Sequence, residues 1–476
     1  MGSGRLPDQV MLYERVILPY FRRVSRAAMA FDVGAVSPPA PPDGADATLY
    51  VHVPFCHVLC PFCSFHRVQY REHKAARYFE ALRREIAWYR DAGFRFSGVY
   101  VGGGTPTVAP RELASTLELV TDSFPVREIS VETNPSDLTP EILGMLQSLG
   151  VNRLSVGVQS FDDGLLREME RLERYGNREA ILRHLDLASG RFATLNVDMI
   201  FNLPHQASAM LDTDLRTVLS SPANQVSFYP LMTSDEVRRK MTARMGRLDR
   251  HRLHRYYRQI LDALQPAFSP SSAWCFSRGS GGGVDEYIAD ATDYVGVGSG
   301  AFSYVGGTMY ATTFSLNAYA DRIAHGLPAI TQQRAMGERE QMRYEMLLRL
   351  FGLRMDDGWL AARFGGRFAR SMAPQLAALR SVGAVKREAG GYVLTERGMY
   401  LWVLMMSAFF ESVNVFREEM RAHIHAELEQ DEDVEDSALA LARITRWVEA
   451  SGTSRAADGG VLESVREAAE PPEPRA

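Results

Sequence analysis

The chain has 476 residues, of which 46% are hydrophobic and 23% charged, so it can bury a large core and has the length of two or three domains. Its 53 Lys and Arg against 58 Asp and Glu give a net charge of -5, which argues against a surface built to bind nucleic acid. Four cysteines are too few for a disulfide framework in a chain of this length, so we expect a reducing, cytoplasmic compartment.

The N-terminal segment 1–45 is expected to be a helical lead-in followed by a linker. Residues 1–23 alternate apolar with charged side chains and lack the continuous apolar core of a signal peptide, so we expect no export signal. Proline and glycine are concentrated at 37–44, a composition typical of a linker.

The next part of the chain predicts a repeated strand-helix pattern. Short runs rich in β-branched residues predict strands at 49–55, 98–101, 128–132, 153–158, 194–201 and 225–231. Segments with apolar residues at three- and four-residue spacing predict helices at 75–91, 111–122, 140–149, 177–188, 209–220 and 250–264. Such βα units build a parallel sheet, and six are fewer than the eight of a closed barrel. We therefore expect an α/β fold, a partial (βα)6 barrel over 46–235, with a barrel extension and substrate-side loops over 236–335.

The C-terminal part is expected to be a separate, mainly helical domain at 336–450. A strand-turn-strand pattern at 384–394, with Gly390-Gly391 at the turn, makes this domain winged-helix-like. The apolar stretch 401–410 covers about half of the ~20 residues of a membrane span, so we expect a buried core helix and no membrane span. Residues 451–476 have few large apolar side chains and are expected to be disordered.

Three cysteines fall within eight residues, as Cys56-His-Val-Leu-Cys60-Pro-Phe-Cys63, directly after the first predicted strand. Three thiolates can hold three irons of a [4Fe-4S] cluster and leave the fourth iron open to a small molecule. Buried structural thiols are one alternative. A Cys3His zinc site is another, with His52, His57 or His66 as the fourth ligand, and spacing alone does not decide between zinc and iron-sulfur.

Glycine-rich or polar residues end the strands that follow. The segment Gly102-Gly-Gly-Thr-Pro-Thr107 ends the second strand, where glycines would let the backbone approach a ligand or simply form a tight turn. Later strand ends carry Glu132 with Asn134, then Gln159, then Asp198. The C-terminal ends of adjacent parallel strands share one face, so we expect these groups beside the cysteines. Each alone is typical of a structural hydrogen bond, but together they would need a polar ligand in an apolar barrel.

Taken together, these segments resemble the radical S-adenosylmethionine (SAM) superfamily, and within it the branch typified by oxygen-independent coproporphyrinogen III oxidase. The resemblance runs from about residue 50 to 319, with a weaker echo from 336 to about 421. The motifs that carry it are Tyr50-Val-His-Val-Pro-Phe-Cys56 with CxxxCxxC, then GGGTPT, Asn152-Arg-Leu-Ser-Val-Gly-Val-Gln-Ser-Phe161 and Asp198-Met-Ile-Phe-Asn-Leu-Pro204.

The resemblance implies two cofactors and a site for each. Cys56, Cys60 and Cys63 would hold a [4Fe-4S] cluster, SAM would bind the open iron, and an electron would cleave it to a 5′-deoxyadenosyl radical. Tyr50, against the cluster, is the implied catalytic residue. The implied cofactor contacts are Tyr50, Phe62, Gly103, Gly104, Thr105, Glu132, Gln159, Arg171 and Asp198. For Arg171 the alternative is a solvated helix face, since 167–174 is rich in charge. A reducing partner such as flavodoxin or ferredoxin is also implied.

One position departs from the coproporphyrinogen-oxidising members, which carry a further cysteine two residues after the third. Here that residue is Phe65, as in relatives that act as haem chaperones or that methylate or degrade other substrates. Three functions therefore stay open: oxidative decarboxylation of a tetrapyrrole, delivery of bound haem, and radical methyl transfer. Arg278 is a candidate partner for substrate propionates, and Cys275 is expected to be a structural thiol.

Overall fold

Six parallel strands form the centre of the fold in the computed structural model, which describes residues 18–33, 36–42, 46–279 and 293–424. They lie side by side in chain order, each paired in parallel with the next. Their bounds are β2 Ala47–Val53, β5 Phe96–Gly103, β6 Glu128–Thr133, β7 Arg153–Gln159, β8 Thr194–Phe201 and β9 Gln225–Pro230. The six predicted strands are confirmed. The expected disordered tail and residues 1–17 of the lead-in lie outside the described residues.

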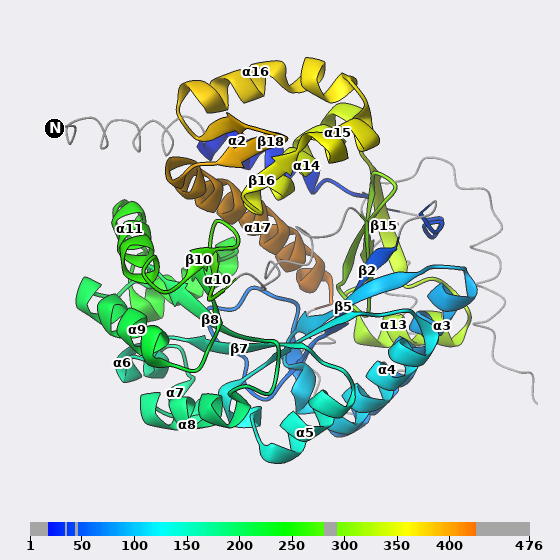
Figure 1. Cartoon of the computed structure of the whole chain (residues 1–476). Coiled ribbons are helices and arrows are strands. Elements are labelled where there is room, and N and C mark those ends of the chain that lie inside the picture. Colours follow the sequence, from blue (N-terminus) through cyan, green and yellow to red (C-terminus); the bar gives the residue numbers. More distant parts are fainter. Residues whose placement is uncertain (1–17, 34–35, 43–45, 280–292, 425–476) are drawn as a thin grey trace, which may run out of the picture.

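Helices cover the outer side of this curved sheet (Figure 1). They are α3 Glu72–Asp91, α4 Pro110–Ser123, α5 Pro140–Ser148, α8 Arg178–Ala188, α9 Ser208–Ser220 and α11 Leu253–Leu264. The predicted helix at 250–264 begins as a 3-10 turn over Arg250–Arg252 and continues as α11. Leu82, Leu117 and Leu185 on the inner helix faces are fully buried, as are Val156 and Val197 of the strands. This apolar layer between helices and strands is the main core.

Further strands extend the sheet at both edges. Beside β2 lie β12 Tyr294–Val297, β13 Phe302–Val305, β14 Thr308–Thr312, β15 Ile330–Ala335 and β1 Asp32–Val33, and beside β9 lie β11 Cys275–Ser277 and β10 Ser269–Pro270. Only β12 joins in parallel, and the other added strands are antiparallel to their neighbours. The sheet runs from β1 to β10 without closing. The barrel is therefore partial and open, as the count of six units predicts.

The C-terminal part packs over the mouth of the barrel. Its elements are α14 Glu338–Phe351, β16 Arg354–Asp356, α15 Asp357–Phe364, α16 Arg367–Ser381, β17 Val385–Glu388, β18 Gly391–Leu394 and α17 Glu396–His423. The predicted hairpin is β17 with β18, and β16 adds a third antiparallel strand that the sequence did not indicate. Figure 1 shows α17 crossing above the barrel strands.

The predicted core helix at 401–410 is part of α17. By length and composition, Glu396–Ala422 is apolar enough to cross a membrane, but 72% of its most apolar window is buried within the protein. Trp402 is fully buried, and its indole nitrogen donates a hydrogen bond to the Leu347 carbonyl at 2.8 Å. The apolar face of this helix is thus covered by the protein itself.

Hydrogen bonds to a buried carboxyl group hold helix α3 against the edge of the barrel. Glu85 of α3 is 3% exposed, and its Oε2 accepts hydrogen bonds from the Tyr319 hydroxyl at 2.6 Å and the Gly298 amide at 2.8 Å. Tyr78 of the same helix donates to the carbonyl of His52 at 2.7 Å. Burial raises the pKa of Glu85 to about 7, because desolvation disfavours the carboxylate more than these donors favour it.

This raised pKa predicts a specific pH dependence of stability. The folded state binds the Glu85 proton more tightly than the unfolded state, so the stabilisation is complete below the unfolded pKa of 4.5 and is lost as the pH rises through about 7. Glu85→Gln keeps an oxygen acceptor and does not ionise. Between about pH 5 and pH 8, the free energy of unfolding of the parent protein should fall relative to Glu85→Gln, by on the order of 3 kcal/mol at most. Chemical denaturation of both proteins across this range measures the difference, and parallel curves would contradict the assignment.

Candidate functional site

A cavity of about 270 Å³ lies at the C-terminal ends of the parallel strands, between the cysteine loop and α17. Its walls come from the ends of β5 to β9, from the loop after β2, and from one face of α17. The residues that the resemblance implies for the cluster and SAM all line it: Tyr50, Cys56, Cys60, Phe62, Cys63, Gly103, Gly104, Thr105, Glu132, Gln159, Arg171 and Asp198. Segments more than a hundred residues apart in the chain therefore meet in one place, as the shared strand-end face predicts.

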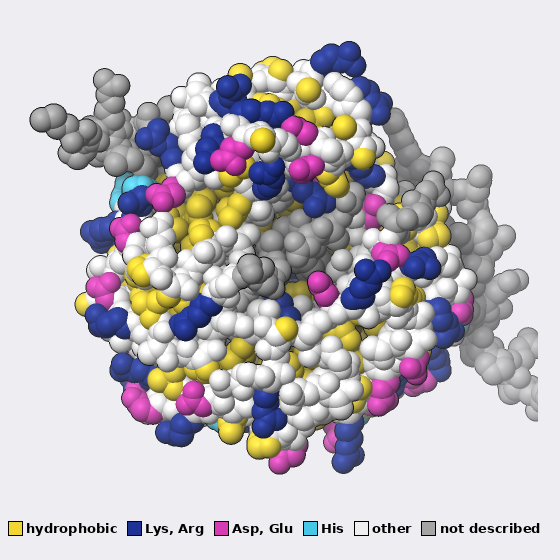
Figure 2. Space-filling model, viewed as in Figure 1, with side chains coloured by type: hydrophobic (Ala, Val, Ile, Leu, Met, Phe, Trp, Pro, Cys, Tyr) yellow, Lys and Arg dark blue, Asp and Glu magenta, His cyan; other side chains and the backbone are white. Residues whose placement is uncertain are grey.

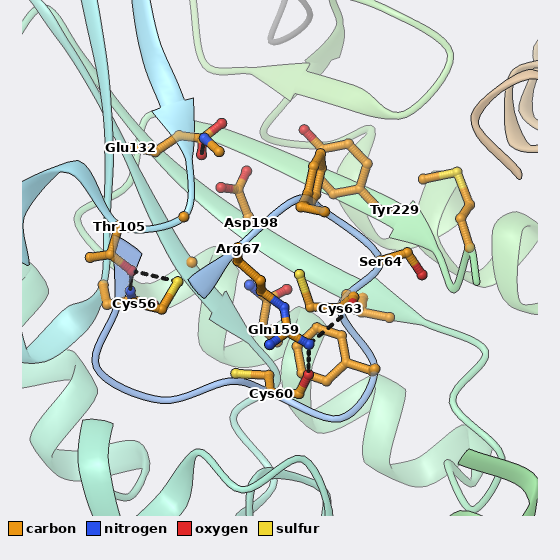
Figure 3. A pocket seen from close by; sticks show the side chains of 18 of the residues that line it. Cys56, Cys60, Cys63, Ser64, Arg67, Thr105, Glu132, Gln159, Asp198 and Tyr229 are labelled. Carbon is orange, nitrogen blue, oxygen red and sulfur yellow. Dashed lines mark hydrogen bonds between the residues drawn. The ribbon is translucent and has the colours of Figure 1, made fainter. Parts of the chain in front are cut away.

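Two short strands close the base of the cysteine loop. Cys56 ends β3 Phe55–Cys56, which pairs in parallel with β4 Val68–Gln69, and the Tyr70 amide donates to the Cys56 carbonyl at 2.9 Å. Inside the loop, the guanidinium of Arg67 donates to the carbonyl oxygens of Cys60 and of Cys63, the latter at 3.0 Å (Figure 3). The sequence analysis missed Arg67, whose role depends on how the loop folds back.

A chain of hydrogen bonds joins two of the cysteines through the strand ends. The Thr105 hydroxyl donates to Cys56 Sγ at 3.6 Å, and Asn134 Nδ2 donates to Thr105 Oγ1 at 2.8 Å. Arg171 donates to Asn134 Oδ1 at 2.8 Å and lies 3.5 Å from Cys60 Sγ. The thiols are therefore held in place by side chains that are themselves fixed.

Arg171 is not on a solvated helix face. The charge-rich stretch is broken, since α6 Asp163–Glu168 ends before it and α7 Leu172–Tyr175 begins after it. Its side chain is buried, its guanidinium lies 4.2 Å from the centre of the Tyr175 ring, and it also donates to the Gly157 carbonyl. The alternative of a solvated surface residue is wrong because these partners replace water.

Two of the histidines considered as zinc ligands use both ring nitrogens elsewhere. His52 Nδ1 is 2.9 Å from the Tyr50 hydroxyl and His52 Nε2 is 3.0 Å from the His66 carbonyl. His66 Nε2 is 3.2 Å from Ser299 Oγ, and its Nδ1 is 3.3 Å from Arg421. Burial lowers the pKa of His52 to about 3, so this ring is neutral. Within the part of the chain that the structure describes, no three His, Cys, Asp or Glu side chains converge to hold a single metal ion.

The protein's own packing requires the two glycines that end and follow β5, Gly103 and Gly104. A Cβ atom at Gly103 would lie 2.4 Å from the His52 ring, and one at Gly104 would lie 2.6 Å from the Phe55 carbonyl oxygen. The backbone of Gly103 also has φ +111°, which favours glycine, and its amide donates to Glu132 at 3.0 Å. The sequence analysis attributed these glycines to ligand approach or a tight turn, but close contact with the end of β2 already demands them.

The ends of β7 and β8 bring an amide and a carboxylate to the cavity. Gln159 has φ +75° at a β-bulge next to Gly157, a conformation that costs free energy outside glycine and is concentrated at functional sites. Asp198 accepts hydrogen bonds from Ser155 at 2.9 Å and Asn196 at 2.7 Å. The Asp198 carboxylate is thereby held in a defined position, and Gln159 lines the same cavity.

The sequence analysis missed most of the far wall. The additional lining residues include Ser64, Phe65, Arg67, Tyr100, Tyr229, Met232, Phe410, Asn414 and Arg417. Phe410 was expected in the core, yet it faces the cavity together with Asn414 and Arg417. Their spacing of four and three residues places them on one face of a helix, and this signal was present in the sequence.

Arg278 and Cys275, both named from the sequence, lie outside the cavity. The Arg278 guanidinium stacks 4.6 Å from the centre of the Phe268 ring and donates to the Leu219 carbonyl at 2.6 Å, so it does not line the cavity and is not placed to meet a propionate there. Cys275 is fully buried in β11 within the hydrophobic core, the setting of a structural thiol.

Comparison with known proteins agrees with this architecture. Residues 50–218 match the radical SAM superfamily model. The haem chaperone HemW of Bacillus subtilis is 28% identical over 392 residues, which cover 76% of this chain and 98% of that protein. The oxygen-independent coproporphyrinogen III oxidase of Bradyrhizobium diazoefficiens is 37% identical over 193 residues, 38% of this chain and 42% of that enzyme.

A solved structure gives the same result for the fold. Coproporphyrinogen III oxidase (HemN) from Escherichia coli, described as a radical SAM enzyme, superposes with a TM-score of 0.64 at 25% identity, covering 76% of this chain and 90% of that one. Residues 50–218 are therefore a radical SAM domain, of the superfamily whose cofactors are a [4Fe-4S] cluster and SAM, and the chain is similar to HemW and to oxygen-independent coproporphyrinogen III oxidase.

Proposed function

We propose that this protein is a radical SAM enzyme that acts on a tetrapyrrole in the cavity between the strand ends and α17. One observation carries the proposal: the three free thiols of the cysteine loop line the same cavity as Glu132 and Asp198. In this proposal Cys56, Cys60 and Cys63 hold the [4Fe-4S] cluster. When bound, the cluster supplies the electron that splits SAM into methionine and a 5′-deoxyadenosyl radical.

The surroundings of the thiols suit a metal cluster. Burial raises the pKa of the Cys56 thiol to about 12, so without a metal this thiol keeps its proton at neutral pH. Metal ligation requires the thiolate and adds negative charge to a buried site. Arg67 and Arg171, which both contact cysteines of the loop, supply positive charge that would offset this negative charge.

The strand ends supply partners for a SAM molecule. In the proposal Gly103, Gly104 and Thr105 lie along its methionine part, Glu132 and Arg171 hold its charged ends, Gln159 and Asp198 line its ribose side, and Tyr50 and Phe62 lie near the cluster. Glu132 already accepts from Tyr100 at 2.8 Å and from the Gly103 amide at 3.0 Å. A carboxylate has about four acceptor sites, so this anchored group retains capacity for an amino group.

Two features of the chain serve a radical reaction on a large substrate. The open barrel admits a bulky molecule. Because α17 covers the mouth of the barrel, water can be excluded once the substrate is bound. The fixed strand-end side chains hold the reacting groups close together. We also propose a reducing compartment and a flavodoxin or ferredoxin as electron donor.

A second function, haem binding and delivery, is favoured by two observations. The sequence similarity to HemW of Bacillus subtilis extends over 98% of that chaperone, whereas the similarity to the Bradyrhizobium diazoefficiens oxidase covers 42% of that enzyme. Phe65 also stands where the oxidising members have a further cysteine. In this case the same cavity would hold haem and the cluster would serve structure or signalling.

Product analysis after anaerobic reconstitution separates these functions. With reductant, SAM and coproporphyrinogen III, an oxidase should release 5′-deoxyadenosine in a substrate-dependent manner. It should also remove carboxyl groups of the propionate side chains as CO2. A delivery protein should bind haem with little SAM turnover, and a methyltransferase should release S-adenosylhomocysteine. Absence of deoxyadenosine with any porphyrinogen or haem would contradict the proposed enzyme.

Cluster binding by the three cysteines is tested one thiol at a time. Replacing Cys56, Cys60 or Cys63 with Ala should lower the iron and sulfide content from about four each per chain to a small fraction, because a site with two thiolates holds a cluster poorly. Cys275→Ala is the matched control and should keep full iron content. Iron and zinc analysis of the purified proteins provides the measurement, and zinc in place of iron in the parent protein would refute the proposal.

Arg67 should determine how firmly the loop holds its metal. Arg67→Met removes donors to two cysteine carbonyls, each worth about 1 kcal/mol, and should speed iron loss to a chelator by about tenfold. Arg67→Lys keeps the charge, and its rate of iron loss should lie between those of the parent and Arg67→Met. The exposed Arg258 offers a matched control as Arg258→Met. Equal release rates in Arg67→Met and the parent would show that these hydrogen bonds do not support the site.

A further inference from the structure

One face of α17 forms the wall of the cavity opposite the strand ends. Phe410, Asn414 and Arg417 lie at helical spacing on this face and all line the cavity. The apolar residues Met232 and Leu231, which follow β9, line the cavity as well. In Figure 3, Ser64 lies on one side of this cavity and Glu132 on the other. The cavity therefore has a second end, away from the strand ends β5 to β8, that is lined by α17 and by the residues after β9.

An exposed aromatic ring on the cysteine loop belongs to this second end. Phe65 lies two residues after Cys63, lines the cavity and is 46% exposed. The guanidinium of Arg417 lies 4.8 Å from the centre of the ring, so one face is covered by a cation. The exposed remainder of the ring can contact a ligand.

Arg417 is held in place by its surroundings. Its side chain is 8% exposed, and its guanidinium also lies 5.5 Å from the centre of the Phe302 ring. Its NH1 donates to Asn414 Oδ1 at 3.0 Å. A guanidinium packed between two rings is poorly hydrated, which strengthens its attraction for a carboxylate and favours paired hydrogen bonds to it.

The acidic and basic side chains that line the cavity come from different walls. Glu132 and Asp198 come from the ends of β6 and β8, whereas Arg417 comes from α17. The other two cavity arginines are bound to the loop and the strand ends: Arg67 to cysteine carbonyls and Arg171 to Asn134. Arg417 is thus the cation that the helix wall adds to the cavity.

We propose that Phe65 and Arg417 form the recognition site for the substrate, binding a flat conjugated ring against Phe65 and a carboxylate substituent on the Arg417 guanidinium. This inference rests on the proposed function, since it assigns the residues that would hold a tetrapyrrole in that cavity. It makes Phe65, which replaces the further cysteine of the oxidising relatives, a contact for the substrate. The pair determines specificity and takes no part in the chemical step.

Binding of coproporphyrin III and of its tetramethyl ester to the reconstituted protein tests the pair directly, without turnover. Porphyrin fluorescence in one detergent-containing buffer reports both affinities. The parent should bind the acid more tightly than the ester. Arg417→Gln should lose about tenfold in affinity for the acid, as expected for a charge-assisted hydrogen bond of about 1.5 kcal/mol, and none for the ester. Arg417→Lys should recover part of the loss.

The second residue and a control complete the design. Phe65→Leu should weaken binding of acid and ester alike, because both present the same ring. Arg278→Gln, at the arginine outside the cavity, should bind both as the parent does. The comparison of acid with ester in the parent needs no variant, so it can overturn the proposal even if a substitution disturbs folding.

The outcomes distinguish this site from the proposed function. If the parent binds acid and ester equally, or if Arg417→Gln binds the acid as the parent does, the recognition site is wrong while a tetrapyrrole-binding function stands. If the parent binds neither porphyrin, both the site and the tetrapyrrole substrate are overturned. A selective loss for the acid in Arg417→Gln, with an unchanged iron content, supports the pair.

Discussion

The site depends on how three free thiols are held around one cavity, two of them buried and Cys63 partly exposed. Burial raises the pKa of Cys56, which makes this thiol costly to ionise, and hydrogen bonds from fixed side chains determine where it lies. The path from Cys56 to Cys60 uses Thr105 and Asn134, which follow β5 and β6, and Arg171, which lies between α6 and α7. The parallel sheet, in turn, is what brings those ends to a single face.

The C-terminal domain is joined to the same loop by direct contacts. Arg421 of α17 donates to the Arg67 carbonyl at 2.8 Å, and the Glu418 carboxylate accepts from the Glu236 amide at the start of α10 Asp235–Met245. The amide of Ser234, just before that helix, donates to Ser64 at 3.1 Å. The cysteine loop therefore contacts both the segment before α10 and the terminal helix α17.

Sequence patterns were sufficient for the framework and for the residues next to motifs. Strands and helices followed from local periodicity, and residues such as Glu132 and Gln159 followed from their place at strand ends. Arg67 was not predicted, because its role depends on how the cysteine loop folds back on itself. Helical spacing groups Arg417 with Phe410 and Asn414 on one face, but only the folded chain shows that this face meets the cavity. Arg278 was wrongly placed at the mouth for the same reason: its position after the last barrel strand gave no information about its stacking on Phe268.

The double attachment of α17 limits how the protein can be redesigned. This helix carries the cavity wall at Phe410 and Arg417 and, one turn later, the contact from Arg421 to the cysteine loop. A graft that exchanged the C-terminal segment for that of a relative would alter the support of the cysteine loop together with the cavity wall. The cavity wall is therefore best changed by single side chains on the inner face of the helix, with its final turn retained.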